Sequence, residues 1–380
     1  MAEPTAVTFS APPRPGPSEH PGPLPRVFGR YVLFDRIGRG GMANIFLARA
    51  DTSLGGSRLC VVKQILTELG RDSNFERALI AEAKLAARLT HANVVQVFDL
   101  GRESERLFIA MEYVEGFDLN QLLRALSKSQ LALPAEFALF VIREVLRALD
   151  YAHRAKDNEG RLFGLVHRDV SPSNVLVSFE GEVKLCDFGI ARAMSAQEDE
   201  AEITVPRVVG KSAYMAPEHA RGEPIDARAD VFAAGILLWE LCAGRRLYRG
   251  SEQEMLAQAK QADVPPLPLR GLPEHDKLQA VLLRALARYR DDRFQSAAEF
   301  LRALEDYAAQ ARLMASQLRF GSFLTDNFAQ EIVELRRARE LSARAFQSEV
   351  PPQAPGGAGE EGEAMPSTMR DSGRVWKEPG

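Results

Sequence analysis

Residues 167–174 of this 380-residue chain read His-Arg-Asp-Val-Ser-Pro-Ser-Asn, and the tripeptide Asp-Phe-Gly follows at 187–189. Phosphoryl transfer needs little covalent chemistry from a protein, but it needs positioned carboxylates and metal-bridged phosphates. Asp169 and Asn174 stand on a predicted loop, where one side chain can orient a hydroxyl and the other can hold Mg²⁺. Asp187 can supply a further oxygen ligand for that metal. The pattern therefore indicates a phosphoryl-transfer site.

A glycine-rich loop follows the strand-like run at 31–37. Residues 38–45 read Gly-Arg-Gly-Gly-Met-Ala-Asn-Ile, and glycines let backbone amides approach a phosphate that a Cβ would obstruct. Ala43 replaces the third glycine of a G-x-G-x-x-G pattern, so taken alone the loop is better explained as a plain hairpin turn. It precedes a strand rather than a helix, which argues against a dinucleotide-binding Rossmann site.

A lysine then interrupts an apolar strand. Lys63 follows Leu-Cys-Val-Val at 59–62, and a lysine among buried residue types is costly unless anions surround it. Glu82, in the helix-like stretch 75–89, is the natural counter-charge. Surface solvation would explain either residue alone, but beside the phosphoryl-transfer motifs a Lys63–Glu82 pair is predicted.

These motifs, with Tyr-Met-Ala-Pro-Glu at 214–218 and Asp230 at the start of an apolar helix, form an ordered set. The set resembles the eukaryotic-type (Hanks-type) Ser/Thr protein kinase family over about residues 31–305. The wording of 167–174 and the insertion at 156–163 are similar to kinases of myxobacteria and related bacteria. The resemblance implies a bilobal α+β fold, with a small β-rich lobe containing one key helix (31–113) and a larger, mainly helical lobe (116–305).

The resemblance also implies a role for each matching residue. The residues that would bind ATP, with Met111 as gatekeeper, are Gly38, Gly40, Gly41, Ile45, Lys63, Met111, Glu112 and Val114. Lys63, oriented by Glu82, would hold the α- and β-phosphates, and Asp169 would be the catalytic base. Asn174 and Asp187 would bind Mg²⁺, for which Mn²⁺ could substitute. Glu218 would pair with Arg293.

Two departures from the family pattern are interpreted together. Ser171 stands where the family usually has Lys, and Lys211 stands where it usually has Thr. In the family these positions lie close to the catalytic Asp. One hypothesis is that Lys211 supplies the missing cation near the γ-phosphate while Ser171 hydrogen-bonds to Asp169, which makes both residues catalytic candidates. The alternative is sequence drift with no functional exchange.

Regulation is predicted from charge. Arg168 beside the catalytic Asp is the type of residue that pairs with a phosphate on the activation segment. The candidate phosphosites are Ser195 and Thr204, of which Thr204 is nearer the usual place. The acidic run at 198–202 could mimic a phosphate, although a solvated loop is the favoured interpretation.

Composition excludes several classes of protein. With 48 basic and 52 acidic residues the net charge is −4, which argues against a non-specific nucleic-acid binder. Three widely spaced cysteines exclude a disulfide framework and a thiolate zinc site. The longest apolar run, 231–241, is shorter than the roughly 20 residues of a spanning helix. We expect no membrane insertion and a cytoplasmic location.

The ends of the chain are predicted to differ from its centre. Residues 1–30 are expected to form a disordered Pro-rich arm, and 346–380 a disordered tail. Segment 306–345 is an appended helical segment that packs on the last domain helix or binds a partner. Strands are expected at 31–37, 44–50, 58–65, 94–100, 106–114, 175–177 and 183–186. Further helices are expected at 135–153, 227–243, 252–261, 276–288 and 296–311.

The sequence therefore predicts a Ser/Thr protein kinase that transfers the γ-phosphoryl group of ATP to protein hydroxyls, with autophosphorylation, in bacterial signalling. Protein substrates and ATP are the predicted partners, with docking through the Pro-rich arm or the C-terminal helix possible. A nucleotide-binding pseudokinase scaffold is the alternative, disfavoured because Lys63, Glu82, Asp169, Asn174 and Asp187 are all present. A small-molecule kinase is disfavoured by Ala-Pro-Glu at 216–218, which ends a peptide-presenting segment in the family.

Overall fold

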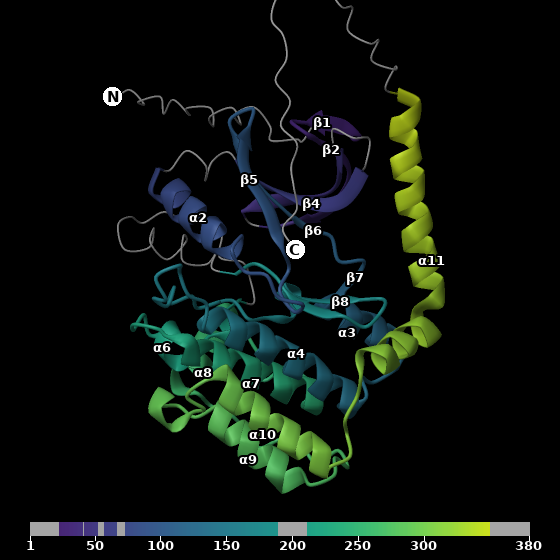
Figure 1. The fold of residues 1–380 in the computed structure, drawn as a ribbon. Helices are drawn as coiled ribbons and strands as arrows, with labels where there is room; N and C mark the ends of the chain where they lie inside the picture. Colours follow the sequence, from purple (N-terminus) through teal and green to yellow (C-terminus); the bar gives the residue numbers. More distant parts are fainter. Residues whose placement is uncertain (1–22, 41, 52–56, 67–72, 189–210, 350–380) are drawn as a thin grey trace, which may run out of the picture.

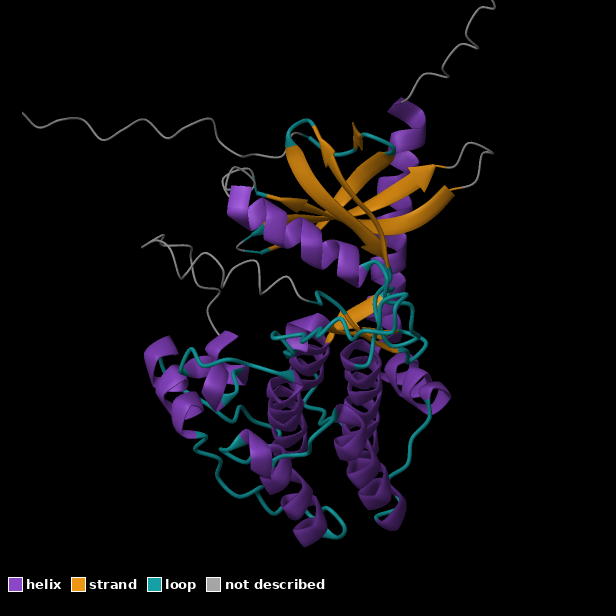
Figure 2. Ribbon diagram, turned by 60° about the vertical axis from the view of Figure 1, so that its left-hand side comes forward, coloured by secondary structure: helices purple, strands orange, loops and turns teal. Residues whose placement is uncertain are grey.

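A computed structural model describes residues 23–40, 42–51, 57–66, 73–188 and 211–349 (Figure 1). These residues form a small β-rich lobe above a larger helical lobe (Figure 2), as the sequence predicts. Gly41, Ser195, Thr204, the acidic run 198–202, most of the Pro-rich arm and the end of the tail lie outside the described residues. Within the described residues, no helix is long and apolar enough to cross a membrane.

The small lobe is an antiparallel six-stranded sheet with the strand order β1-β2-β3-β4-β6-β5. Its strands are β1 Arg26–Phe28, β2 Tyr31–Arg39, β3 Ala43–Asp51, β4 Ser57–Ile65, β5 Val97–Glu103 and β6 Arg106–Glu112. Helix α2, Ser73–Ala86, packs on one face through Leu79 and Ala83, while an aromatic cluster with Phe46 and Phe108 covers the other. Both faces of β4 are therefore covered, which explains its continuous apolar run.

Strand β1 corrects one prediction. Residues 1–30 were expected to be a disordered arm, but Arg26–Phe28 pairs with β2. Phe28 is buried, with its ring edge-to-face against Phe108 at 5.4 Å between centroids. A three-residue strand is too short for an alternating hydrophobic pattern to reveal it among prolines.

The large lobe is built mainly from helices around the buried pair α4 and α7. Its elements are β7 Gly116–Asp118, α3 Leu119–Lys128, α4 Ala135–His153, β8 Val175–Ser178, β9 Val183–Leu185, α6 Pro217–Ala220, α7 Ala227–Ala243, α8 Glu252–Gln261, α9 His275–Ala285 and α10 Ala297–Gln310. The predicted helices and the β8–β9 pair are confirmed. Helix α3 was not predicted; Asp118 caps its N-terminus in a capping box with Gln121.

The last helix, α11 Gln317–Glu349, confirms a helix after the large lobe but not its predicted packing. Its aromatic contacts are with α4 and β7, through Phe320 on Phe137 and Phe328 on Phe117, rather than with α10. The helix is kinked at Phe328, where the backbone angles are not helical (φ −131°, ψ 25°). Beyond the kink α11 runs beside the small lobe (Figures 1 and 2).

Candidate active site

A buried carboxylate fixes the loop that carries the predicted catalytic residues. Asp230, in the first turn of α7, accepts hydrogen bonds from the backbone amides of His167 (2.7 Å) and Arg168 (2.8 Å). His153 Nε2 lies 2.8 Å from the same carboxylate. Burial opposes ionisation of Asp230, but the hydrogen bonds with His153 and His167 outweigh it and lower the pKa of this carboxyl. Arg168 is held in the left-handed region (φ 67°) between these contacts and Asp169.

Sequence reasoning placed Asp230 at the start of an apolar helix but missed this function. The available signal was chemical: an aspartate among residues that bury on all sides must have hydrogen-bond partners from elsewhere in the chain. Its partners lie more than 60 residues away in sequence. A local sequence pattern therefore cannot identify them.

His167 connects the loop to the segment before Asp187. Its Nδ1 accepts a hydrogen bond from the backbone amide of Asp169 (3.2 Å), so its Nε2 carries the proton and donates to the carbonyl of Cys186 (2.9 Å). The ring is fully buried and packs against Phe188 at 4.5 Å between centroids. The imidazole thus ties the positions of Asp169 and Asp187 together.

The two predicted metal ligands are neighbours in space. Asn174 Nδ2 donates to the backbone carbonyl of Asp169 (2.8 Å), and the amide of Cys186 donates to the carbonyl of Asn174 (2.9 Å). Because Nδ2 is engaged, Oδ1 is the side-chain atom that Asn174 can offer a cation. Asp187 follows Cys186 directly, in the left-handed region (φ 62°). The structure therefore brings Asn174, Asp187 and Asp169 into one group.

Lys63 joins this group from the small lobe. Its Nζ lies 2.8 Å from each carboxylate oxygen of Asp187. In the sheet, Lys63 is opposite Ile45 of β3 and Ile109 of β6. The predicted Lys63–Glu82 ion pair is not formed: Glu82 is buried on α2, and among the described residues Lys63 pairs with Asp187. Both carboxylate oxygens of Asp187 contact the Lys63 ammonium, so in this arrangement Asp187 rather than Glu82 of α2 neutralises its charge.

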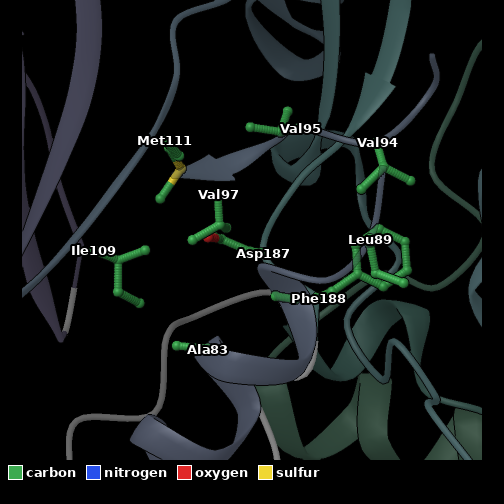
Figure 3. A pocket seen from close by; sticks show the side chains of 10 residues that line it. Ala83, Leu89, Val94, Val95, Val97, Ile109, Met111, Asp187 and Phe188 are labelled. Carbon is green, nitrogen blue, oxygen red and sulfur yellow. The ribbon is translucent and has the colours of Figure 1, made fainter. Parts of the chain in front are cut away.

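A small apolar cavity lies between α2 and this ion pair. Its volume is about 20 Å³, enough for about one water molecule, and Ala83, Met111, Asp187 and Phe188 are among the residues that line it (Figure 3). The predicted gatekeeper Met111 and the predicted metal ligand Asp187 thus border the same space as α2. A shift of α2 would therefore change the space next to both Met111 and Asp187.

The remaining predicted ATP-binding residues that the structure describes lie on β2, β3 and β6 and in the connection between the lobes. Gly38 pairs with Ile45 in the β2–β3 ladder, and a Cβ at Gly38 would lie 3.4 Å from the Ile45 side chain. The amide of Gly40 donates to the carbonyl of Ala43 (2.9 Å), which closes the loop. Glu112 ends β6 and binds Lys184 (2.9 Å), and Val114 follows in the connection between the lobes.

The Ser171 and Lys211 hypothesis receives a partial correction. Ser171 Oγ lies 3.0 Å from Ser173 Oγ, and within the described residues it forms no hydrogen bond with Asp169. Lys211 begins the short helix Lys211–Tyr214, and its side chain lies outside the described residues. The proximity of Ser173 in the sequence explains the preference of Ser171 for this local contact.

The predicted Glu218–Arg293 pair is confirmed. The guanidinium forms two hydrogen bonds of 2.7 Å to the carboxylate, and the side chains are 0% and 4% exposed for Arg293 and Glu218. Arg293 also donates to three backbone carbonyls, of residues 228, 287 and 288. This pair fixes the end of the 214–218 segment to the base of the large lobe.

These features are those of a protein kinase fold, and the chain belongs to this family: the protein kinase domain family matches residues 31–324. The kinase domain of Mycobacterium tuberculosis PknI superimposes with a TM-score of 0.56 and 29% identity, covering 74% of this chain and 97% of that domain.

Curated relatives are also kinases by name. The chain is 38% identical over 312 residues to "Tyrosine-protein kinase MasK" of Myxococcus xanthus, covering 81% of this chain and 48% of that protein. It is 37% identical over 285 residues to "Probable serine/threonine-protein kinase PknB" of Bifidobacterium longum, covering 72% of this chain and 39% of that protein. The chain thus spans less than half the length of these relatives.

Proposed function

We propose that this chain is a Ser/Thr protein kinase that transfers the γ-phosphoryl group of ATP to hydroxyls of proteins, itself included, in bacterial signalling. One observation carries the proposal: Asn174 is hydrogen-bonded to Asp169 and to the residue before Asp187, and Asp187 pairs with Lys63. A base, two oxygen ligands and an ammonium therefore meet at one place, which is the set that phosphoryl transfer requires.

The donor set fits Mg²⁺. The carboxylate of Asp187 and Oδ1 of Asn174 are hard oxygen ligands, and Mg²⁺ commonly takes one or two protein ligands and completes its shell with phosphate and water. When bound, the metal neutralises phosphate charge. Asp187 already contacts Lys63 Nζ at 2.8 Å, so the ammonium is positioned to contact a phosphate beside this carboxylate.

The chain's own residues then supply orientation and proton transfer. The backbone of Asp169 is fixed on both sides, by His167 and by Asn174, so its carboxylate can accept the proton of an incoming hydroxyl from a constant position. Gly38, Gly40 and Ile45 cover the phosphates, and Met111, Glu112 and Val114 bind the adenine. Glu82 would orient Lys63 after a shift of α2.

Transfer to tyrosine is the second candidate, because the relative MasK is named a tyrosine kinase. Purified protein with labelled ATP, Mg²⁺ and a generic protein substrate distinguishes the two by phosphoamino-acid analysis. We expect labelled phosphoserine or phosphothreonine, and loss of all labelling with EDTA. Label confined to phosphotyrosine would contradict Ser/Thr specificity, and no label at all would favour the nucleotide-binding scaffold.

Lys211 provides a separate test of the catalytic arrangement. If its ammonium replaces the Lys missing at position 171, Lys211→Ala should lower kcat by roughly 10²-fold, the typical effect of removing one charge-stabilising donor. The double variant Ser171→Lys with Lys211→Thr, which restores the family pattern, should regain most of the activity. Lys260→Ala, at an exposed helix end, is the control. Near wild-type activity of Lys211→Ala would rule out the exchange.

Several sequence-based predictions stay predictions. Phosphorylation of Ser195 or Thr204, docking through the Pro-rich arm or the C-terminal helix, and a cytoplasmic location are consistent with this function. Phosphosite mapping after incubation with ATP and Mg²⁺ tests the first of these directly.

A further inference from the structure

We propose that α11 is a brace that holds the small lobe over the large lobe, and that Arg336 positions it against the hinge, the connection between the lobes at residues 113–115. The inference rests on the proposed function in one respect, namely that ATP binds between the lobes at the hinge. Figure 1 shows α11, in yellow, passing from the large lobe upward beside the small lobe, and Figure 2 shows the same course from another side.

The lower part of α11 is firmly fixed to the large lobe. Phe320, Leu324 and Phe328 are fully buried, and the ring of Phe320 stacks on Phe137 of α4 at 5.0 Å between centroids. Gly321 allows a close approach, because a Cβ there would lie 2.8 Å from backbone atoms of Glu180. Burial of three large apolar side chains anchors this part of the helix against the lobe.

The kink at Phe328 directs the helix to the connection between the lobes. The ring of Phe328 lies edge-to-face on Phe117 of β7, with 5.7 Å between centroids. Phe117 comes shortly after Val114, the predicted adenine-binding residue. The buried ring therefore holds the turning point of α11 against the strand that continues from the hinge.

About two turns beyond the kink, Arg336 contacts the hinge itself. Its Nε and Nη2 donate to Oε2 of Glu115 at 3.0 and 2.8 Å, and Nη2 also lies 3.2 Å from Oε1 of Glu180. Glu115 directly follows Val114, and Glu180 lies in the turn between β8 and β9. One guanidinium thus joins the hinge to the large lobe.

Above Arg336, α11 lies beside β2, the strand that leads into the glycine-rich loop (Figures 1 and 2). A single helix therefore contacts the large lobe, the hinge and the strand that positions Gly38. Opening of the lobes would pull β2 away from a helix that is fixed at its other end. The brace is expected to favour the lobe arrangement in which the nucleotide site is formed.

Charge reversal at Arg336 tests the brace. Arg336→Glu replaces two attractions, to Glu115 and Glu180, by two repulsions. We expect KM for ATP to rise about 3- to 10-fold with kcat within about 2-fold, and hydrogen exchange in β2 and at residues 112–118 to quicken. Glu115→Arg combined with Arg336→Glu should restore part of both changes.

Arg337→Glu is the matched control. Arg337 is the next residue on the same helix, it is exposed, and among the described residues it forms no hydrogen bond or ion pair. It makes the same change of net charge without touching the hinge. Equal exchange rates in β2 for the Arg336→Glu and Arg337→Glu variants would overturn the brace. If the wild type transferred no phosphate, the proposed function would fail, while the exchange comparison would still decide whether α11 restrains the small lobe.

Discussion

Asp169→Asn should reduce kcat by roughly 10²- to 10⁴-fold, the usual contribution of a positioned general base, with little change in KM for ATP. The hydrogen bonds that fix Asp169 to His167 and Asn174 use its backbone amide and carbonyl. The amide side chain therefore leaves these two backbone contacts in place while it removes the proton acceptor. Steady-state kinetics with a protein substrate and varied ATP measures both constants.

A control variant with the same loss of charge separates the effect of Asp169→Asn on catalysis from its effect on stability. Asp306→Asn makes the same replacement on an exposed position of α10, and it should leave kcat and the melting temperature unchanged. Asp169→Asn should melt within a few degrees of the wild type, because its backbone contacts persist. Retention of more than about a tenth of wild-type kcat would remove Asp169 from the role of base.

Much of the large lobe could be predicted because its signals are local. Helices α4 and α7 are marked by apolar runs, and α8 and α10 by the amphipathic spacing of a helix, all within single segments. The structure reproduces the predicted bounds of these four helices within a residue or two. The Glu218–Arg293 pair was predicted from a family resemblance rather than from local pattern. Asn174 and Asp187 were assigned to one metal site from the oxygen ligands that phosphoryl transfer needs, and the resemblance implied the same roles.

What could not be predicted depends on contacts between distant segments. Strand β1 exists because Phe28 fits an aromatic cluster that includes residues of β2, β3 and β6. The partner of Lys63 depends on where α2 lies relative to β4, which no residue type in either segment specifies. The course of α11 depends on the fit of Phe328 against Phe117 and of Gly321 against Glu180. In each case the outcome depends on how side chains from distant segments pack in three dimensions. The sequence shows only that these side chains are apolar or charged.

Arg293→Met should destabilise the large lobe by about 3–5 kcal/mol, the typical cost of leaving one member of a buried ion pair without its partner. All five N–H donors of Arg293 are engaged, two with Glu218 and three with backbone carbonyls, and its guanidinium lies over the ring of Phe232 at 4.7 Å. Arg293→Lys should also be destabilising, because an ammonium cannot reproduce this planar set of donors. The expected change is a fall of about 10 °C in the melting temperature.

The double variant Arg293→Met with Glu218→Leu distinguishes two causes of the lower stability: the unpaired carboxylate of Glu218 and the lost packing of Arg293. It removes both charges, so it should be more stable than Arg293→Met alone, although the carbonyls of residues 228, 287 and 288 still lose their donor. Arg288→Met is the control, since that side chain is exposed and should shift the melting temperature by little. If Arg293→Met melted like Arg288→Met, the pair would contribute nothing to stability. If the double variant were less stable than Arg293→Met, the loss would come from packing and carbonyl contacts rather than from the uncompensated carboxylate. We expect the stability of the double variant to lie between those of Arg293→Met and the wild type. That order would show that the buried Glu218–Arg293 ion pair holds the end of the 214–218 segment.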